Sequence, residues 1–345
     1  MTELRLLFLN AFLLRPLRVG VGPLRWEPGA APAAADRATE LGRTVVGAYD
    51  VVALAEAFAV EDRRRVLEGW PADAPRPAVA VGPEGGWGRA GGRTATSSGL
   101  ATLVDGPAVT RVERHRYTAA GHRLADADPW AAKGVLLVEV DVGLPGRVEV
   151  YSTHLCAGGG LFPVAGDRVA GTDAVRRAQA EELVAFVDAT HQPANLALVV
   201  GDVNVPAGGR TDRDLAATLA PAGLEDLWLG LGSGPGPTSG LERVGGELGR
   251  LDPADPRFAP DDDPAPEAPT PEGPASPVDP AERIDRVFLQ RPRPEHGLAV
   301  RHAVLRRRPF PRRADAPDRH RLPFLSDHLG LHLELTLAPA PDREG

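Results

Sequence analysis

Short apolar runs rich in Val and Leu recur along the whole of this 345-residue chain, and helix-like stretches separate some of them. Such runs predict β-strands, whereas longer stretches with apolar residues at helical spacing predict α-helices. The predicted strands cover residues 4–10, 50–55, 78–81, 100–104, 134–140, 148–154, 196–203, 284–289, 298–305 and 329–337; the predicted helices cover 35–47, 60–68, 173–190 and 212–219, the long one after a Thr172 cap. Because strands dominate and several are close neighbours, we expect an α+β fold of mixed sheets covered by helices.

The length of the chain fits one large domain or two modest ones, and 43% hydrophobic residues are enough to build a core. We expect a single domain over residues 1–340. One segment differs in composition: residues 251–282 contain nine acidic residues and a single arginine, with many Pro and Ala. This composition predicts a loosely packed or disordered loop, or an insertion within the domain.

Charge and cysteine content exclude several classes of protein. The net charge of −8 disfavours a broad nucleic-acid-binding surface, and the single Cys156 excludes an intramolecular disulfide. No apolar run reaches the length of a membrane span, and the short run at residues 6–14 is interrupted by Asn10, which argues against a signal peptide. We therefore expect a cytoplasmic monomer. Residues 301–321 hold eight arginines and two aspartates, which either solvate the surface or meet an anionic substrate or membrane.

Several predicted strands end in a polar side chain that continues an apolar face. Side chains alternate between the two faces of a strand, so Leu198, Val200, Asp202 and Asn204 share one face. By the same rule His154 ends the face of Val148 and Val150, Asn10 ends that of Leu4 to Phe8, and Glu56 ends that of Val52 and Leu54. A carboxylate at the end of a buried face needs a partner, because burying an unpaired charge is costly.

Two further segments add an Asp–His pair. Asp285 lies at the head of a predicted strand, and Asp327 and His328 come directly before the last one. An imidazole oriented by a carboxylate suits general-base catalysis. Strict alternation places His328 on the face opposite the Leu stripe of the last strand, so the pairing requires this strand to begin after His328. The site would then contain four carboxylates, those of Glu56, Asp202, Asp285 and Asp327. They repel one another unless a hard cation with oxygen ligands is present, most simply Mg²⁺ or else Mn²⁺.

The ordered set of motifs resembles the endonuclease/exonuclease/phosphatase superfamily, whose members share a deoxyribonuclease-I-like fold. The matching segments are Leu-Phe-Leu-Asn10, Val-Val-Ala-Leu-Ala-Glu56-Ala-Phe, Ser-Thr-His154-Leu, Gly-Asp202-Val-Asn204, Arg-Ile-Asp285-Arg-Val-Phe and Ser-Asp327-His328. The resemblance implies a two-sheet mixed β-sandwich flanked by helices, in four α/β/β/α layers. Within the superfamily the chain is most similar to the sphingomyelinase-type phosphodiesterases, through Asn10-Ala-Phe-Leu-Leu-Arg-Pro, Glu56-Ala-Phe before an Arg-rich helix, Lys133-Gly134 entering a strand, and Arg176 with Gln179.

The resemblance and the charge argument together imply roles at the metal. Glu56 and Asn10 would hold the cation, and Asp327 would touch a second metal or orient His328. His328, oriented by Asp285, would take a proton from the attacking water.

The other motif residues would act on the water and the phosphate. Asp202 would orient the water or the base, Asn204 would bind the phosphate, and His154 would donate to a phosphate oxygen. Lys133 is the only lysine of the chain, and we expect it near the bound substrate.

These residues predict a divalent-metal-dependent hydrolase that cleaves a phosphodiester by in-line attack of water. A small phosphodiester or phospholipid is the expected substrate, with peripheral membrane contact left open. Two alternatives remain at this stage: a nuclease of the same superfamily, disfavoured by the negative charge, and a non-catalytic member that binds a phosphorylated ligand or a partner. Mg²⁺-dependent turnover of lipid and nucleic-acid phosphodiesters discriminates among them.

Overall fold

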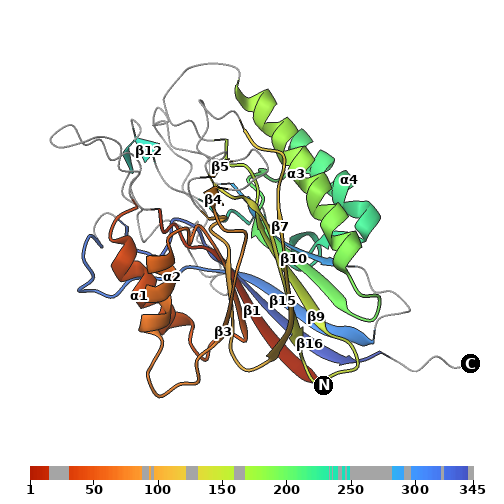
Figure 1. Ribbon diagram of the computed structural model, residues 1–345, viewed down its shortest axis with the longest axis horizontal. Helices are drawn as coiled ribbons and strands as arrows, with labels where there is room; N and C mark the ends of the chain where they lie inside the picture. Colours follow the sequence, from red (N-terminus) through yellow and green to blue (C-terminus); the bar gives the residue numbers. More distant parts are fainter. Residues whose placement is uncertain are drawn as a thin grey trace, which may run out of the picture.

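Two six-stranded sheets packed face to face form the centre of the protein, seen here in a computed structural model (Figure 1). The structure describes residues 1–14, 31–87, 93–94, 97–121, 131–158, 168–232, 234, 236–239, 243–244, 247–248, 282–290, 297–319 and 322–340. The acidic segment predicted at 251–282 therefore lies outside the described residues except for Glu282. The prediction of one domain over 1–340 stays a prediction.

The first sheet has the strand order β15-β16-β1-β2-β6-β3, and the second has the order β11-β14-β10-β9-β8-β7. Within the first, β1 and β2 are parallel, and within the second, β9 and β10 are parallel; the other pairs are antiparallel. The first sheet consists of β1 Thr2–Asn10, β2 Val51–Ala55, β3 Ala78–Val81, β6 Ala101–Val104, β15 Leu298–Arg308 and β16 Gly330–Pro339. The second consists of β7 Ala108–Arg116, β8 Gly134–Asp141, β9 Val148–His154, β10 Leu196–Asp202, β11 Leu224–Asp226 and β14 Asp285–Gln290.

Helices cover the outer faces of both sheets, which confirms the four-layer α/β/β/α arrangement. Figure 1 shows α1 (Ala34–Val45) and α2 (Val60–Gly69) on one side of the sandwich, with α3 (Arg168–Thr190) and α4 (Arg210–Leu219) on the other. Smaller elements are the 3₁₀ turn η2 (Ala220–Ala222), α5 (Trp228–Leu231) and the hairpins β4 Gly86–Trp87 with β5 Arg93–Thr94 and β12 Arg243–Val244 with β13 Glu247–Leu248. Among the described residues, no helix is long and apolar enough to cross a membrane.

The alternation of side chains divides the core into layers. Leu6 and Phe8 of β1 pack between the sheets against residues such as Val200 of β10, whereas Leu7 and Leu9 pack outward beneath α1 and α2. Each large side chain buried in this way contributes about 1.5–3 kcal/mol. A slip of one residue would turn every apolar side chain to the wrong face, so burial fixes the register of the strands. A fixed register places the ends of β1, β2, β9 and β10 reproducibly at one end of the sandwich.

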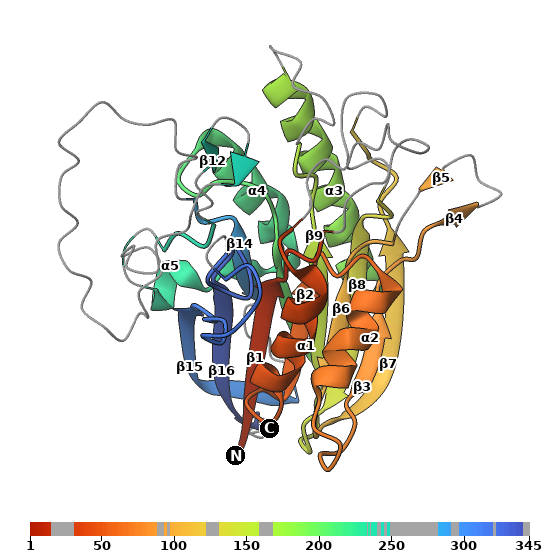
Figure 2. The same cartoon turned by 90° about the vertical axis from the view of Figure 1, so that its left-hand side faces the viewer.

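Most predicted elements are found, with informative differences. The predicted strand 148–154 coincides with β9, whereas the long helix starts at Arg168 rather than after Thr172. Strand β7 was not predicted, because it carries arginine, glutamate and histidine side chains and lies half-exposed at a sheet edge. Figure 2 shows β7 and β3 at one edge of the sandwich, with β15 at the other.

Candidate active site

Polar residues from four strands meet at one end of the sandwich. The register pairs Asp202, the last residue of β10, with His154 at the end of parallel β9 and with Asp285 at the start of antiparallel β14. From the opposite sheet, the Nδ2 atom of Asn10 donates a hydrogen bond of 3.0 Å to Oδ2 of Asp202. All four side chains are buried. The strand ends predicted to share polar faces therefore come together, and Asn10 and Asp202 join the two sheets.

Left-handed backbone at three positions shapes this end of the sandwich. Phe12, Glu56 and Asn204 have φ values of 49°, 58° and 51°. These values lie in the left-handed region, in which residues other than glycine are strained. The prediction that Glu56 shares a face with Val52 and Leu54 was wrong, because those two side chains pack beneath α1 and α2. Glu56 follows the last residue of β2, and its backbone turn brings Oε1 to 4.0 Å from Nε2 of His154.

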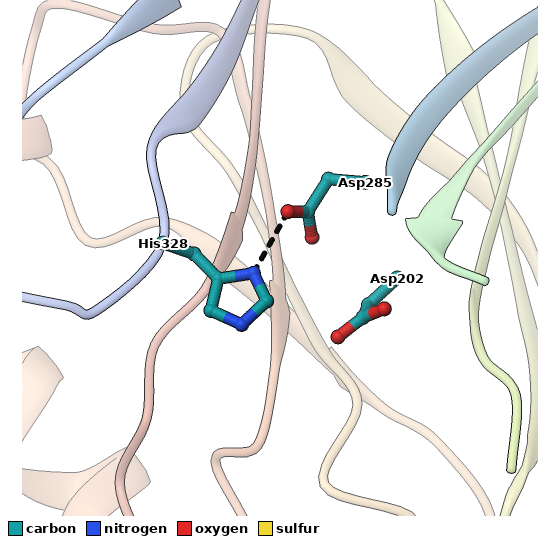
Figure 3. A group of neighbouring side chains, drawn as sticks. All are labelled: Asp202, Asp285 and His328. Carbon is teal, nitrogen blue, oxygen red and sulfur yellow. Dashed lines mark hydrogen bonds and ion pairs between the residues drawn. The ribbon is translucent and has the colours of Figure 1, made fainter. Parts of the chain in front are cut away.

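His328 and Asp285 form the Asp–His pair. The Nδ1 atom of His328 lies 2.7 Å from Oδ2 of Asp285, and Figure 3 shows the carboxylates of Asp285 and Asp202 on the same side of the imidazole ring. One ligand atom from each of these three side chains lies within 4.8 Å of the others. Strand β16 begins at Gly330, so His328 is outside the strand and the alternation problem does not arise.

Two hydroxyl residues that were not predicted hold this pair in place. The buried Thr238 accepts hydrogen bonds at Oγ1 from the backbone N–H groups of Ile284 (3.2 Å) and Asp285 (3.0 Å), and its carbonyl accepts one from Leu329. Ser326 holds the segment of His328 in place. Its Oγ donates to the carbonyl of Asn10 and accepts the N–H of His328 at 3.0 Å. No feature of the sequence distinguishes Thr238, whereas Ser326 lies inside the recognised Ser-Asp-His motif.

The electrostatics at Glu56 indicate that the site favours a cation. Burial, reinforced by the charges of Asp327 and Asp202 and opposed by those of His328 and Lys133, raises the pKa of the Glu56 carboxyl from 4.5 to about 7. Burial likewise raises the pKa of Asp327. The buried Oδ1 atom of Asp285 has no hydrogen-bond partner in the described part of the chain. Oxygen donors with excess negative charge fit a hard divalent ion. The sequence predicts Glu56, Asp327 and Asn10 as its ligands, and Asp202, Asp285 and His328 also bring ligand atoms close together.

The imidazole of His328 is strongly affected by its neighbours. Burial alone lowers its pKa, but the charges of Asp285 and Asp327, together with the hydrogen bond to Asp285, outweigh burial and hold the pKa well above 6.5.

The predicted phosphate-binding residues gather around one backbone carbonyl. The carbonyl of Leu155, the residue after His154, accepts hydrogen bonds from Nζ of Lys133 at 2.7 Å and from Nδ2 of Asn204 at 3.1 Å. The Nε2 atom of His154 lies 3.7 Å from Oδ2 of Asp202. Lys133, Asn204 and His154 are therefore brought to the same end of the sandwich as the Asp–His pair, and their role in binding phosphate stays a prediction.

Arginines on the covering helices hold the segments that follow the site strands. Arg63 of α2 donates to the carbonyls of Ala57 and Phe58, directly after Glu56. Arg176 of α3 donates to the carbonyls of Cys156 and Ala157, directly after Leu155. A guanidinium carries several donors in a planar fork, so one side chain can bind two carbonyls at once.

The basic residues at 301–319 do not form one uniform surface. Arg307 lies over the ring of Trp228, 5.5 Å from its centroid, and donates to the carbonyl of Pro237. Arg312 is buried, with Nε 3.7 Å from a carboxylate oxygen of Glu40. These two arginines serve internal contacts, which favours the structural interpretation for them.

Comparison with known proteins agrees with this geometry. Residues 28–328 match the Endonuclease/Exonuclease/phosphatase family. No curated protein sequence matches the chain. Among solved structures, beta toxin from Staphylococcus aureus is similar with a TM-score of 0.63 and 17% identity, covering 96% of this chain and 99% of the toxin. A double mutant of that toxin with bound magnesium ions gives a TM-score of 0.57 at 17% identity, again covering 96% of this chain and 99% of the toxin.

Two other solved structures share the fold. Sphingomyelinase C from Streptomyces griseocarneus has a TM-score of 0.57 and 19% identity, and the match covers 97% of this chain and 100% of that enzyme. Truncated TDP2 from Caenorhabditis elegans has a TM-score of 0.52 and 15% identity, with 96% of this chain and 97% of the other covered. At these identities the likeness concerns the fold.

Proposed function

Since this chain belongs to the endonuclease/exonuclease/phosphatase family, a family of phosphoester hydrolases, we propose that it is a Mg²⁺-dependent phosphodiesterase acting on a phospholipid-type substrate. The observation that carries the proposal is the Asp285–His328 pair beside Asp202, at the end of the sandwich that also holds Glu56 and Asp327. A base oriented by a carboxylate, next to oxygen donors for a cation, is what direct hydrolysis of a phosphodiester needs.

His328 acts as the general base in this proposal. It takes a proton from a water molecule, the water oxygen bonds to phosphorus, and one phosphorus–oxygen ester bond breaks to release an alkoxide. The alkoxide takes up a proton from solvent to become the alcohol, and the imidazolium of His328 returns its proton to solvent. Asp285 holds the imidazole through Nδ1, so that Nε2 is the nitrogen that receives the proton. Asp202 orients the water or the imidazole.

A divalent cation held by Glu56, Asn10 and Asp327 would neutralise a non-bridging phosphate oxygen and the developing charge on the leaving oxygen. His154, Asn204 and Lys133 bind the phosphate from the other side. Lys133 and Asn204 share the carbonyl of Leu155, which keeps both donors next to His154. The negative charge of the phosphate would be met by the ammonium group of Lys133, with hydrogen bonds from His154 and Asn204.

The substrate class rests on two observations. The motifs of the chain are most similar to those of sphingomyelinase-type enzymes, and sphingomyelinase C and beta toxin are among the proteins of similar fold. Magnesium is supported by the magnesium ions bound in the beta toxin double mutant.

Release of the phosphorylated headgroup from sphingomyelin and from phosphatidylcholine tests this proposal. Purified protein is assayed with Mg²⁺, with Mn²⁺ and with EDTA, and His328→Ala is purified in parallel. Metal-dependent release that disappears in His328→Ala supports the proposal. Metal-dependent hydrolysis of a generic phosphodiester without any release of headgroup from lipid would rule out the lipid substrate. It would still support a metal-dependent phosphodiesterase.

The nuclease is the second candidate, because the matched family includes endonucleases and exonucleases. The net charge of −8 and the inward-facing Arg307 and Arg312 disfavour it, since affinity for nucleic acid depends on neutralising many phosphates. Plasmid nicking that is lost in His328→Ala would favour the nuclease. Nicking that survives this substitution would indicate a contaminating enzyme.

A further inference from the structure

One arginine connects the two segments that carry predicted metal ligands from opposite ends of the chain. Arg37 of α1 is fully buried. Its Nε donates to the carbonyl of Pro32 at 2.8 Å, and its Nη1 donates to the carbonyls of Ala11 at 3.0 Å and Leu325 at 2.6 Å. Its Nη2 donates to the carbonyl of Phe12, and the guanidinium lies over the ring of Phe12, 5.4 Å from the centroid.

The position of these carbonyls in the chain gives the contact its importance. Ala11 and Phe12 follow Asn10 directly, and Leu325 precedes the Ser326-Asp327-His328 motif by one residue. The same two segments are joined by Ser326, whose Oγ donates to the carbonyl of Asn10. Arg37 and Ser326 therefore bridge segments 10–12 and 325–328 from two sides.

Arg37 also places a positive charge behind the acidic site. The hydrogen-bond acceptors of Arg37 named above are all backbone carbonyls, and none is a carboxylate. Burial lowers the pKa of Arg37 to about 10, and the charge of Asp327 opposes this shift, so the side chain stays protonated at neutral pH. A buried charge is costly to keep, and the carbonyl dipoles around it repay part of that cost.

A lysine could not make the same set of contacts. Its ammonium is a compact point charge, whereas the guanidinium holds its donors in a fixed planar fork. Arg63 and Arg176 use this fork on the segments after Glu56 and His154, but each binds carbonyls of one segment only. Arg63 also reaches the side chains of Ser97 and Glu84. Arg37 differs because its carbonyl acceptors lie on the two segments that carry the predicted metal ligands Asn10 and Asp327.

We propose that Arg37 is a positioning residue that fixes segments 10–12 and 325–328 relative to each other, and thereby maintains the separation of Asn10 and Asp327 that cation binding requires. The proposal rests on the proposed function, in which these two residues help to hold the metal. Partners that orient metal ligands typically change metal affinity by about 10–100-fold when they are removed.

The test compares wild-type protein with Arg37→Lys and Arg37→Met. Mg²⁺ and Mn²⁺ binding are measured by calorimetry, and amide hydrogen exchange is measured for peptides covering residues 10–14 and 324–330. We expect both variants to bind metal about tenfold more weakly and to exchange faster in these two peptides, because Lys retains the charge but not the fork. With substrate, kcat should fall while KM changes little.

Arg111→Lys is the matched control for a purely structural effect. Arg111 is a partly buried arginine that contacts Glu149, Glu139 and the carbonyl of Thr190, at the end of β9 opposite His154. Its replacement should lower the melting temperature and leave metal affinity unchanged. The proposal is overturned if folded Arg37→Lys binds Mg²⁺ within twofold of wild type, or if Arg111→Lys weakens metal binding as much as Arg37→Lys does.

If neither Arg37 variant folds, Phe12→Leu tests the positioning role of Arg37 instead. Phe12→Leu removes the ring beneath the guanidinium and leaves Arg37 in place. A loss of Mg²⁺ affinity of about threefold supports the proposal, since this change loosens one contact only; wild-type affinity overturns it. If wild-type protein itself binds no divalent metal, the proposed function fails, and hydrogen exchange in the same two segments still decides whether Arg37 positions them.

Discussion

Nδ1 of His328 and Oδ2 of Asp285 lie 2.7 Å apart, although 43 residues separate them in the chain. This contact fixes which imidazole nitrogen faces the reacting water. We predict that Asp285→Asn lowers kcat/KM by about 10³–10⁴-fold, because the amide can hold the ring but does not stabilise the imidazolium or the correct tautomer.

The matched control for Asp285→Asn is Asp50→Asn, which removes a carboxylate from the partly exposed pair with Arg5. This control should retain wild-type kinetics. Circular dichroism checks that both proteins fold, and Asp285→Asn activity within tenfold of wild type would argue against His328 as an oriented base.

The raised pKa of Glu56 predicts how metal binding depends on pH. In the metal-free protein this carboxyl titrates near 7 instead of 4.5, so the native state holds its proton more tightly and the stability contributed by Glu56 falls as pH rises across this interval. A metal needs the ionised carboxylate, so its affinity should rise over the same interval. We predict that the increase in melting temperature caused by Mg²⁺ is small near pH ~5.5 and levels off above pH ~8.

Glu56→Gln tests the origin of that pH dependence. The amide has the same shape and no titration in this range, so the variant should show a weak Mg²⁺ response with little change between pH ~5.5 and ~8. A full, pH-dependent response in Glu56→Gln would assign the metal to other residues. The melting temperatures of both proteins, measured with Mg²⁺ and with EDTA, provide the comparison.

Two substitutions at Asn204 separate backbone strain from chemistry. Asn204 has a φ of 51°, where glycine is comfortable and alanine is strained by about 1–2 kcal/mol. Asn204→Gly should therefore keep much of the stability and still lose activity, by about 10²-fold, as expected for removal of one donor to a developing charge.

Asn204→Ala should lose a similar amount of activity and also unfold at lower urea concentration than Asn204→Gly. Equal stability of the two variants would show that the left-handed backbone does not constrain this position. Wild-type activity in Asn204→Gly would remove Asn204 from the phosphate-binding residues.

We predict that Thr238 positions Asp285, the partner of His328, without contacting the substrate. Its Oγ1 accepts the N–H groups of Ile284 and Asp285, so Thr238→Val would leave two buried donors without this acceptor, at a cost of about 1–3 kcal/mol each. We expect lower stability and lower kcat in Thr238→Val and recovery of both in Thr238→Ser. Failure of Ser to restore activity would assign the effect to the methyl group of Thr238.

Much of this architecture could be predicted from side-chain alternation. The rule places Leu4, Leu6 and Phe8 on the face that ends in Asn10, and Leu198 and Val200 on the face that ends in Asp202. It holds because both strands pair without register shifts and are buried up to their last residues. The rule fails one residue beyond a strand. Glu56 has left-handed backbone, which turns it away from the face of Leu54 and towards His154.

The residues that support the site were harder to predict. Arg37 resembles an ordinary charged helix residue, yet it precedes Leu41 by one helical repeat of four and so lies on the buried face of α1. A charged residue on the apolar face of a helix can therefore be used to predict a buried, structurally important charge. Thr238 offers no such signal, because its role depends on contacts with segments 284–285 and 329 that only the fold brings together.

The basic residues show the limit of composition as a guide. Eight arginines between 301 and 321 left two interpretations open, solvation of the surface or contact with an anionic ligand. Arg307 packs on Trp228 and Arg312 is buried beside Glu40, so these two fit neither. Counting charges does not reveal which side chains turn inward, because strand register and loop packing decide it.

The proposed metal-dependent hydrolysis with His328 as base can be measured on bis(p-nitrophenyl) phosphate, with purified wild-type protein and His328→Ala, each with Mg²⁺ and with EDTA. This substrate requires no lipid or nucleic-acid recognition and reports only metal-dependent cleavage of a phosphodiester. We predict turnover by wild type with Mg²⁺, none with EDTA, and a loss of at least about 10³-fold in His328→Ala. Turnover that persists in EDTA, or that is equal in wild type and His328→Ala, would contradict it.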